Sequence, residues 1–79
     1  MPPPATGRNF RVLVGAFETR EEALIMRDKV REVPGREKAF LVQDSYVWQV
    51  QAASGPNLDG VERIARELLA AGIMGVIVV

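Results

Sequence analysis

The sequence contains an internal repeat, and this repeat limits the folds open to the chain more than any other feature. When the 79-residue chain is shifted so that Phe10 falls on Trp48, residues of similar kind coincide along its length. The further coincidences are Val12 with Val50, Thr19 with Asn57, Ala23 with Val61, Met26 with Ile64, Val30 with Leu68, and Phe40 with Val78. A chain of this length holds one small domain. The repeat therefore predicts one domain built from two similar halves.

The first half has the pattern of a strand, a helix and a second strand. Phe10–Val14 is short and rich in strand-forming residues, which predicts a strand. Thr19 and Glu22 have the spacing of a capping box, which predicts a helix from about Arg20 to Glu32. The apolar stripe of that helix is Ala23, Met26, Val30 and Val33. Pro34 and Gly35 should end it, and a second strand is expected over Lys38–Gln43.

The second half repeats this order. A tight turn at Asp44–Ser45 should lead into a third strand over Tyr46–Ala53. Asn57 is a candidate N-cap for a helix over Leu58–Ala71, with Gly72 as its C-cap. The apolar face of this helix is Val61, Ile64, Ala65 and Leu68. Gly75–Val79 is expected to be the fourth strand.

Two such halves predict an α+β fold of the ferredoxin-like βαβ-βαβ type. Its four-stranded antiparallel sheet should carry both helices on one face, with the first and third strands in the centre. Alternation directs one set of side chains toward the helices: Phe10, Val12, Val14, Trp48, Val50 and Ala52. Arg11, Leu13, Gln49 and Gln51 then lie on the other face, which no predicted element covers. That face is either a binding surface or an ordinary solvated sheet face.

Two aromatic residues have alternative interpretations. Trp48 and Tyr46 could be platforms on which a sugar ring stacks. Strict alternation places both on the side of the helices, however, and so favours packing.

The composition excludes most catalytic chemistry. The chain has no His and no Cys, so it lacks the usual general base, thiolate nucleophiles and the commonest zinc ligands. Its carboxylates alternate with basic residues at helical spacing, as on solvated helix faces. We therefore expect no enzyme activity, no catalytic residue, no metal and no cofactor. Lys plus Arg is 10 and Asp plus Glu is 10, and a net charge of zero disfavours nucleic acid as a partner.

The N-terminal segment differs in composition from the rest. Pro2, Pro3 and Pro4 predict an extended linker or tail over residues 1–8, with the domain over residues 9–79. The segment has neither the charged nor the apolar region of a signal peptide, and no stretch is apolar enough to span a membrane. Any targeting segment is therefore expected to lie in a part of the protein outside this sequence.

Two motifs resemble a known family. Phe10–Phe17 (FRVLVGAF), followed by Ala23, resembles the opening half of a SPOR (sporulation-related repeat) domain. That family has the pattern aromatic-x-Val-Gln-Val-Gly-x-Phe followed by a helix. Trp48–Ala53 resembles the second repeat more weakly, and the resemblance covers about residues 9–79. The chain departs from the family at Leu13, where Gln is usual, at Gln49, where Arg is frequent, and at Ala53–Ser54, where Gly-Pro is usual.

The resemblance implies a function. SPOR domains bind septal peptidoglycan through the open sheet face and favour glycan strands that amidases have stripped of stem peptides. A similar bacterial chain would localise a larger cell-envelope protein, on the periplasmic or cell-wall side, in cell division or sporulation. By position the resemblance implies noncovalent ligand contacts from Arg11, Leu13, Gln49 and Gln51. Leu41 and Gln43 join this set if Phe40 and Val42 face the helices.

Other functions stay open on the residues alone. A ferredoxin-like protein-interaction or small-ligand regulatory module could use the same face. The apolar edge strand Gly75–Val79 could pair with another chain, including a second copy in a weak homodimer. Single-stranded RNA binding is disfavoured, because the exposed positions of the central strands carry no aromatic side chain.

Overall fold

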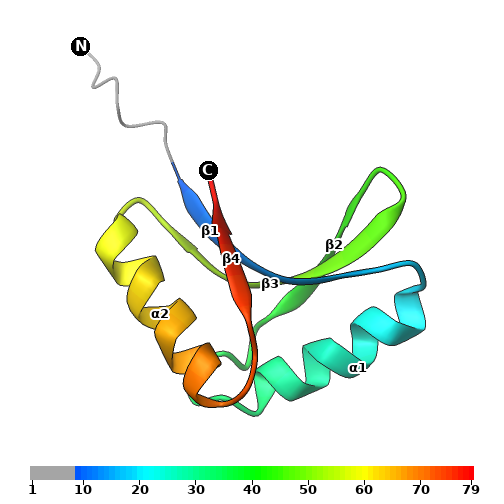
Figure 1. The fold of residues 1–79 in the computed structure, drawn as a ribbon, viewed down its shortest axis with the longest axis horizontal. Coiled ribbons are helices and arrows are strands. Elements are labelled where there is room, and N and C mark those ends of the chain that lie inside the picture. Colours follow the sequence, from blue (N-terminus) through cyan, green and yellow to red (C-terminus); the bar gives the residue numbers. More distant parts are fainter. Residues whose placement is uncertain (1–8) are drawn as a thin grey trace.

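A computed structural model of the chain describes residues 9–79. Its elements, in chain order, are β1 (Phe10–Phe17), α1 (Arg20–Arg31), β2 (Phe40–Asp44), β3 (Val47–Gly55), α2 (Leu58–Ala70) and β4 (Gly75–Val78). The expected linker over residues 1–8 lies outside the described residues. Figure 1 shows a single sheet with α1 and α2 packed below it, so the predicted α+β architecture is confirmed.

The strands are arranged in the order β2-β3-β1-β4, and each neighbouring pair is antiparallel. β1 and β3, which are the first strands of the two repeats, lie in the centre as predicted. Each repeat thus contributes one central and one edge strand. β2 and β4 form the two edges of the sheet.

Local sequence sets the start of both helices. The Thr19 Oγ1 accepts a hydrogen bond from the Glu22 N–H at 3.2 Å and donates one to the Glu22 Oε1 at 3.1 Å. The Asn57 Oδ1 accepts bonds from the backbone N–H groups of Asp59 and Gly60. Both residues satisfy donors that a helix start leaves unpaired, as the sequence predicted.

The end of α2 is a Schellman motif. Gly72 has a φ of +84°, and the Ile73 N–H donates to the Leu68 carbonyl at 2.9 Å. The Gly72 N–H donates to the Leu69 carbonyl at 2.9 Å. Leu68 and Ile73 are both buried, so the motif directs the chain into the core on its way to β4.

The core lies between the sheet and the two helices. The largest fully buried side chains are Leu68, Val12, Val14, Val30 and Val50. The expected alternation on β1 and β3 is therefore confirmed at its central positions. Trp48 is half-buried, lies opposite Phe17 and Gln43, and stands outside the buried cluster.

Two irregularities bend the central pair of strands. Val12 lies opposite Ala53 and Leu13 lies opposite Gln51, so Ala52 is an extra residue on β3. Between Val14 and Phe17, β1 instead carries one residue more than β3. Such bulges let β1 continue to Phe17 rather than end at Val14.

The β2–β3 hairpin differs from the sequence-based prediction by one residue. The turn is Ser45–Tyr46, with Ser45 at a φ of +56°, rather than Asp44–Ser45. Tyr46 is therefore at the tip of the turn and 91% exposed, so the prediction that it packs under the sheet is wrong.

The faces of β2 are the reverse of those assumed from sequence. Leu41 lies opposite the buried Val50 and packs against the core. Phe40 lies opposite Gln51 and Val42 opposite Gln49, so these two take the uncovered face. The turn is not the cause, because a two-residue turn at Asp44–Ser45 would set Phe40 opposite Gln49, on the same uncovered face. The assumption that Phe40 and Val42 face the helices was itself inconsistent with the predicted hairpin.

Candidate functional site: the open sheet face

No described element covers the face of the sheet opposite the helices, and we call this surface the open face. The strand register assigns its side chains: Arg11 and Leu13 on β1, Phe40 and Val42 on β2, Gln49, Gln51 and Ser54 on β3, and Val76 and Val78 on β4. The sequence predicted Arg11, Leu13, Gln49 and Gln51 here, and the structure places all of them on this face.

The open face has a polar centre between two apolar borders. Arg11, Gln49 and Gln51 are half-buried on the central strands. Phe40, 48% exposed, lies on the β2 edge, and Val76, 59% exposed, lies on the β4 edge. A ligand across the face would meet hydrogen-bonding groups in the middle and apolar surface on both sides.

A hollow of about 240 Å³ lies within the open face. Its lining is Arg11, Leu13, Val42, Gln43, Asp44 and Gln49. Leu13 is only 7% exposed although no helix covers it, and its cross-strand neighbours on the same face are Gln51 and Val76. The hollow therefore combines guanidinium, amide and carboxylate groups with apolar side chains, which suits a ligand that has hydroxyl groups and an apolar ring face.

Gln49 is oriented by a contact inside the protein. Its Nε2 donates a hydrogen bond to the Gly15 carbonyl at 3.1 Å. Gly15 has a φ of +74° and lies in the irregular part of β1, where the regular ladder is interrupted. The bond ties β3 to this bulge and directs the amide of Gln49 along the sheet.

The other two predicted ligand residues have different positions. Leu41 packs against the core and does not lie on the open face. Gln43 contributes to the hollow, although its register partner Trp48 places its side chain on the opposite face by alternation. The structure therefore brings Arg11, Leu13, Gln43 and Gln49 together and separates Leu41 from them.

Sequence reasoning missed Phe40, Val42, Ser54, Val76 and Val78. Alternation about the apolar Ile77 would have found the two valines of β4. Phe40 and Val42 would have followed from the predicted turn, which sets Phe40 opposite Gln49. Ser54 reaches the open face only because of the bulge at Ala52, for which the sequence has no local signal.

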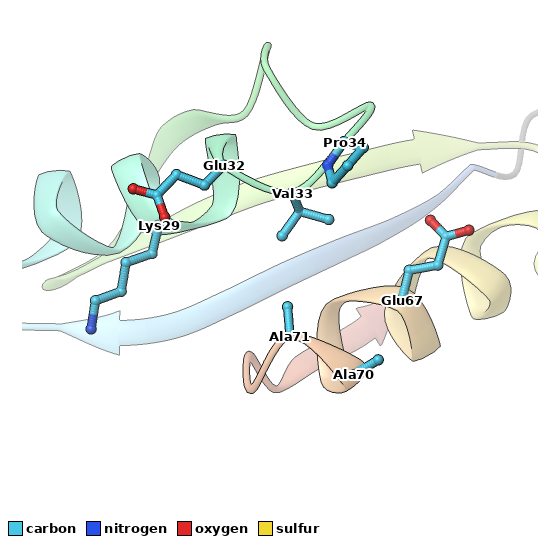
Figure 2. Close-up of a pocket in the computed structure, with 7 residues that line it drawn as sticks. All are labelled: Lys29, Glu32, Val33, Pro34, Glu67, Ala70 and Ala71. Carbon is cyan, nitrogen blue, oxygen red and sulfur yellow. The ribbon is translucent and has the colours of Figure 1, made fainter.

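A larger pocket of about 670 Å³ lies on the helix side, between the C-terminal ends of α1 and α2 (Figure 2). Its lining is Lys29, Glu32, Val33, Pro34, Glu67, Ala70 and Ala71. Figure 2 shows Lys29 and Glu32 pointing away from Glu67, so the charged groups do not converge on a common point. The open face is the better candidate, because its polar groups lie together.

Metal and membrane features are absent from the described part of the chain. Residues 9–79 contain no group of three or more His, Cys, Asp or Glu side chains that could hold a metal ion. Over the same residues, neither helix has the length and apolar character needed to cross a bilayer.

The comparisons with known proteins give one similar fold. No protein-family model and no curated protein matches the sequence. Among solved structures, the chain is similar to the solution structure of the peptidoglycan-binding domain of the B. subtilis cell wall lytic enzyme CwlC. The TM-score is 0.83 at 15% sequence identity, over 99% of this chain and 96% of that domain. The chain therefore has the fold of that peptidoglycan-binding domain.

Proposed function

We propose that the chain is a noncovalent peptidoglycan-binding module of the SPOR type, which uses the open face. The observation that carries the proposal is the match over nearly the whole chain to a domain that binds peptidoglycan. The motif over Phe10–Phe17 supports it independently, because it resembles the same kind of domain at the level of residues.

The chemistry of the open face supports glycan as the ligand. Arg11 and Gln51 offer donors to sugar hydroxyl and acetamido groups, and Phe40 and Val42 offer apolar surface to a pyranose ring. Each such hydrogen bond contributes only about 1 kcal/mol. The single module should therefore bind weakly and gain strength through attachment to a larger protein.

The finer features of the proposal follow from the resemblance. The preferred ligand is the glycan strand freed of stem peptides, and the module localises a larger envelope protein in cell division or sporulation. The setting is the periplasm or the cell wall. Residues 1–8 serve as the linker, and the module itself carries no catalytic group.

Cosedimentation with purified sacculi, before and after amidase treatment, tests this proposal. We expect binding that increases after treatment. The double variant Gln49→Ala/Gln51→Ala should lose binding while keeping its circular dichroism spectrum. Arg66→Ala, on the exposed surface of α2, is the control and should bind like the unmodified chain. If the double variant and the control bind sacculi equally well, the open face is not the binding site.

We also propose that the outer edge of β4 supports a weak homodimer. β4 pairs only with β1 among the described strands, and Gly75–Val79 has no charged residue to oppose pairing. Antiparallel pairing about Ile77 would set Val76 against Val78 of a second copy, on one continuous open face. The contact is far smaller than the ~1,600 Å² of a standard interface, so it should be weak.

Sedimentation should show a mass that rises with concentration, and Val76→Lys should abolish the rise. A constant mass contradicts this proposal.

A further inference from the structure

Arg36 makes an unusual contact for a residue in a loop. It lies between α1 and β2, is half-buried, and its Nη1 donates a hydrogen bond to the Ala52 carbonyl at 3.1 Å. Its Nε is buried and has no hydrogen-bond partner among the described residues. Burial of an unpaired donor is costly. The hydrogen bond from Nη1 to the Ala52 carbonyl helps to offset this cost.

Ala52 lies where the regular pairing of β3 with its neighbouring strands is interrupted. It is the extra residue of the β3 bulge, so it has no register partner on β1. It also lies beyond the last β2 pair, which joins Phe40 to Gln51. Ala52 thus has no register partner on either side, and Arg36 supplies the donor that a neighbouring strand would otherwise provide.

The bulge decides which side chains reach the open face. Ala52 is buried in the core, and Ala53 lies opposite Val12 and packs against the same core. Ser54 then lies opposite Arg11, on the open face. Strict alternation from Gln51 would instead put Ala53 on the open face and turn Ser54 under the sheet.

We infer that Arg36 is a positioning residue for the open face, because it holds the bulge that places Ser54 beside Arg11. Arg36 need not touch the ligand itself. Its effect on binding rests on the proposed function, whereas its effect on strand register does not.

Arg31 provides a matched control. Its Nε donates to the Ala39 carbonyl at 2.9 Å, so it makes a part-buried guanidinium-to-carbonyl bond like that of Arg36, but between α1 and the loop that follows it. Ala39 lies outside the bulge. Arg31→Ala should therefore remove a comparable bond without changing the position of Ser54.

Nuclear magnetic resonance of the two alanine variants tests the register directly. In Arg36→Ala, we expect the cross-strand contact between Val12 and Ala53 to weaken and the amide signals of residues 51–55 to broaden. In Arg31→Ala, both should stay as in the unmodified chain. Arg36→Lys should restore the register, because one nitrogen makes the bond. An unchanged contact between Val12 and Ala53 in Arg36→Ala would overturn the inference.

The effect of Arg36 on ligand binding is measured by cosedimentation with amidase-treated sacculi, at a temperature where every variant is folded. Arg36→Ala should bind roughly two- to tenfold more weakly than Arg31→Ala, the range expected for losing about one hydrogen bond.

If Arg36→Ala does not fold, Ser54→Ala takes its place and should show the same loss with an intact register. Undiminished binding by Ser54→Ala would overturn the role of the bulge in binding. If the unmodified chain does not bind the sacculi, the proposed function is rejected. The magnetic resonance measurement of the strand register then still decides whether Arg36 holds the bulge.

Discussion

At Gly75 the sheet leaves no room for a side chain. A Cβ there would lie 2.7 Å from the Val12 Cγ1 and 3.7 Å from the Leu68 Cδ1, both in fully buried side chains. Val12 is β-branched and stiff, so it cannot yield easily. We predict that Gly75→Ala lowers the free energy of unfolding by about 1–3 kcal/mol, measured by urea denaturation.

Gly55→Ala is the control for this prediction. A Cβ at Gly55 would have no atom within 4 Å. Its effect on the free energy of unfolding should stay within about 0.5 kcal/mol. Equal losses at the two positions would contradict the packing described around β4.

Glu37 gives a prediction about pH. The Gly35 N–H donates to its Oε2 at 3.0 Å, and this bond, with one from its own backbone N–H, holds the pKa of Glu37 below its ordinary value of 4.5. The bond therefore contributes to stability above pH 4.5 and is lost as the pH falls through the lowered pKa. Titration should show the Gly35 amide signal following the Glu37 carboxyl.

The control is Glu37→Gln, in which the Gly35 amide should no longer titrate in that range. A Glu37 midpoint at or above the ordinary value would contradict the contact.

Single residues were predictable where their partners are close in sequence. The contact of Thr19 with Glu22 and the turn at Gly72 each lie within a few residues, so spacing alone predicts them. The bond from Gln49 to Gly15 spans 34 positions and the bond from Arg36 to Ala52 spans 16. Such contacts depend on the folded sheet and have no local signature.

Among the elements, the end of α2 can be tested without changing the core. Gly72 has a φ of +84°, and a Cβ there would meet no atom within 4 Å. Gly72→Ala should therefore lower the free energy of unfolding by about 1–2 kcal/mol through backbone strain alone. Thermal unfolding measures the change.

Gly72→Asn serves as the comparison, because Asn tolerates the left-handed region better than Ala. Its loss should be smaller. An equal loss in both variants would contradict a purely conformational cause.

The helices could be predicted more fully than the strands. Caps and apolar spacing placed α1 and α2 to within a residue at each end. Strand limits depend on partners distant in sequence, and the bulge before Phe17 lengthened β1. Leu41 was assigned to the wrong face because Phe40 and Val42 were assumed to face the helices, although the predicted turn already sets Leu41 opposite Trp48.

For the whole molecule, the internal repeat was enough to predict the architecture. Two equivalent halves with both helices on one side leave the other side of the sheet uncovered. The polar centre followed from alternation on the two central strands. The apolar borders were missed although the sequence contains signals for them: the predicted turn sets Phe40 opposite Gln49, and alternation about Ile77 places Val76 on the open face.

The most direct test of the open face as a glycan site is chemical-shift mapping with soluble glycan strands freed of stem peptides. We predict that perturbed signals gather on the central strands and include the side-chain groups of Arg11, Gln49 and Gln51. The signals lining the pocket between α1 and α2 should stay unchanged, which makes them an internal control. Perturbation confined to Val33, Pro34 and Ala70, or none at saturating glycan, would contradict the proposal that the open face binds peptidoglycan.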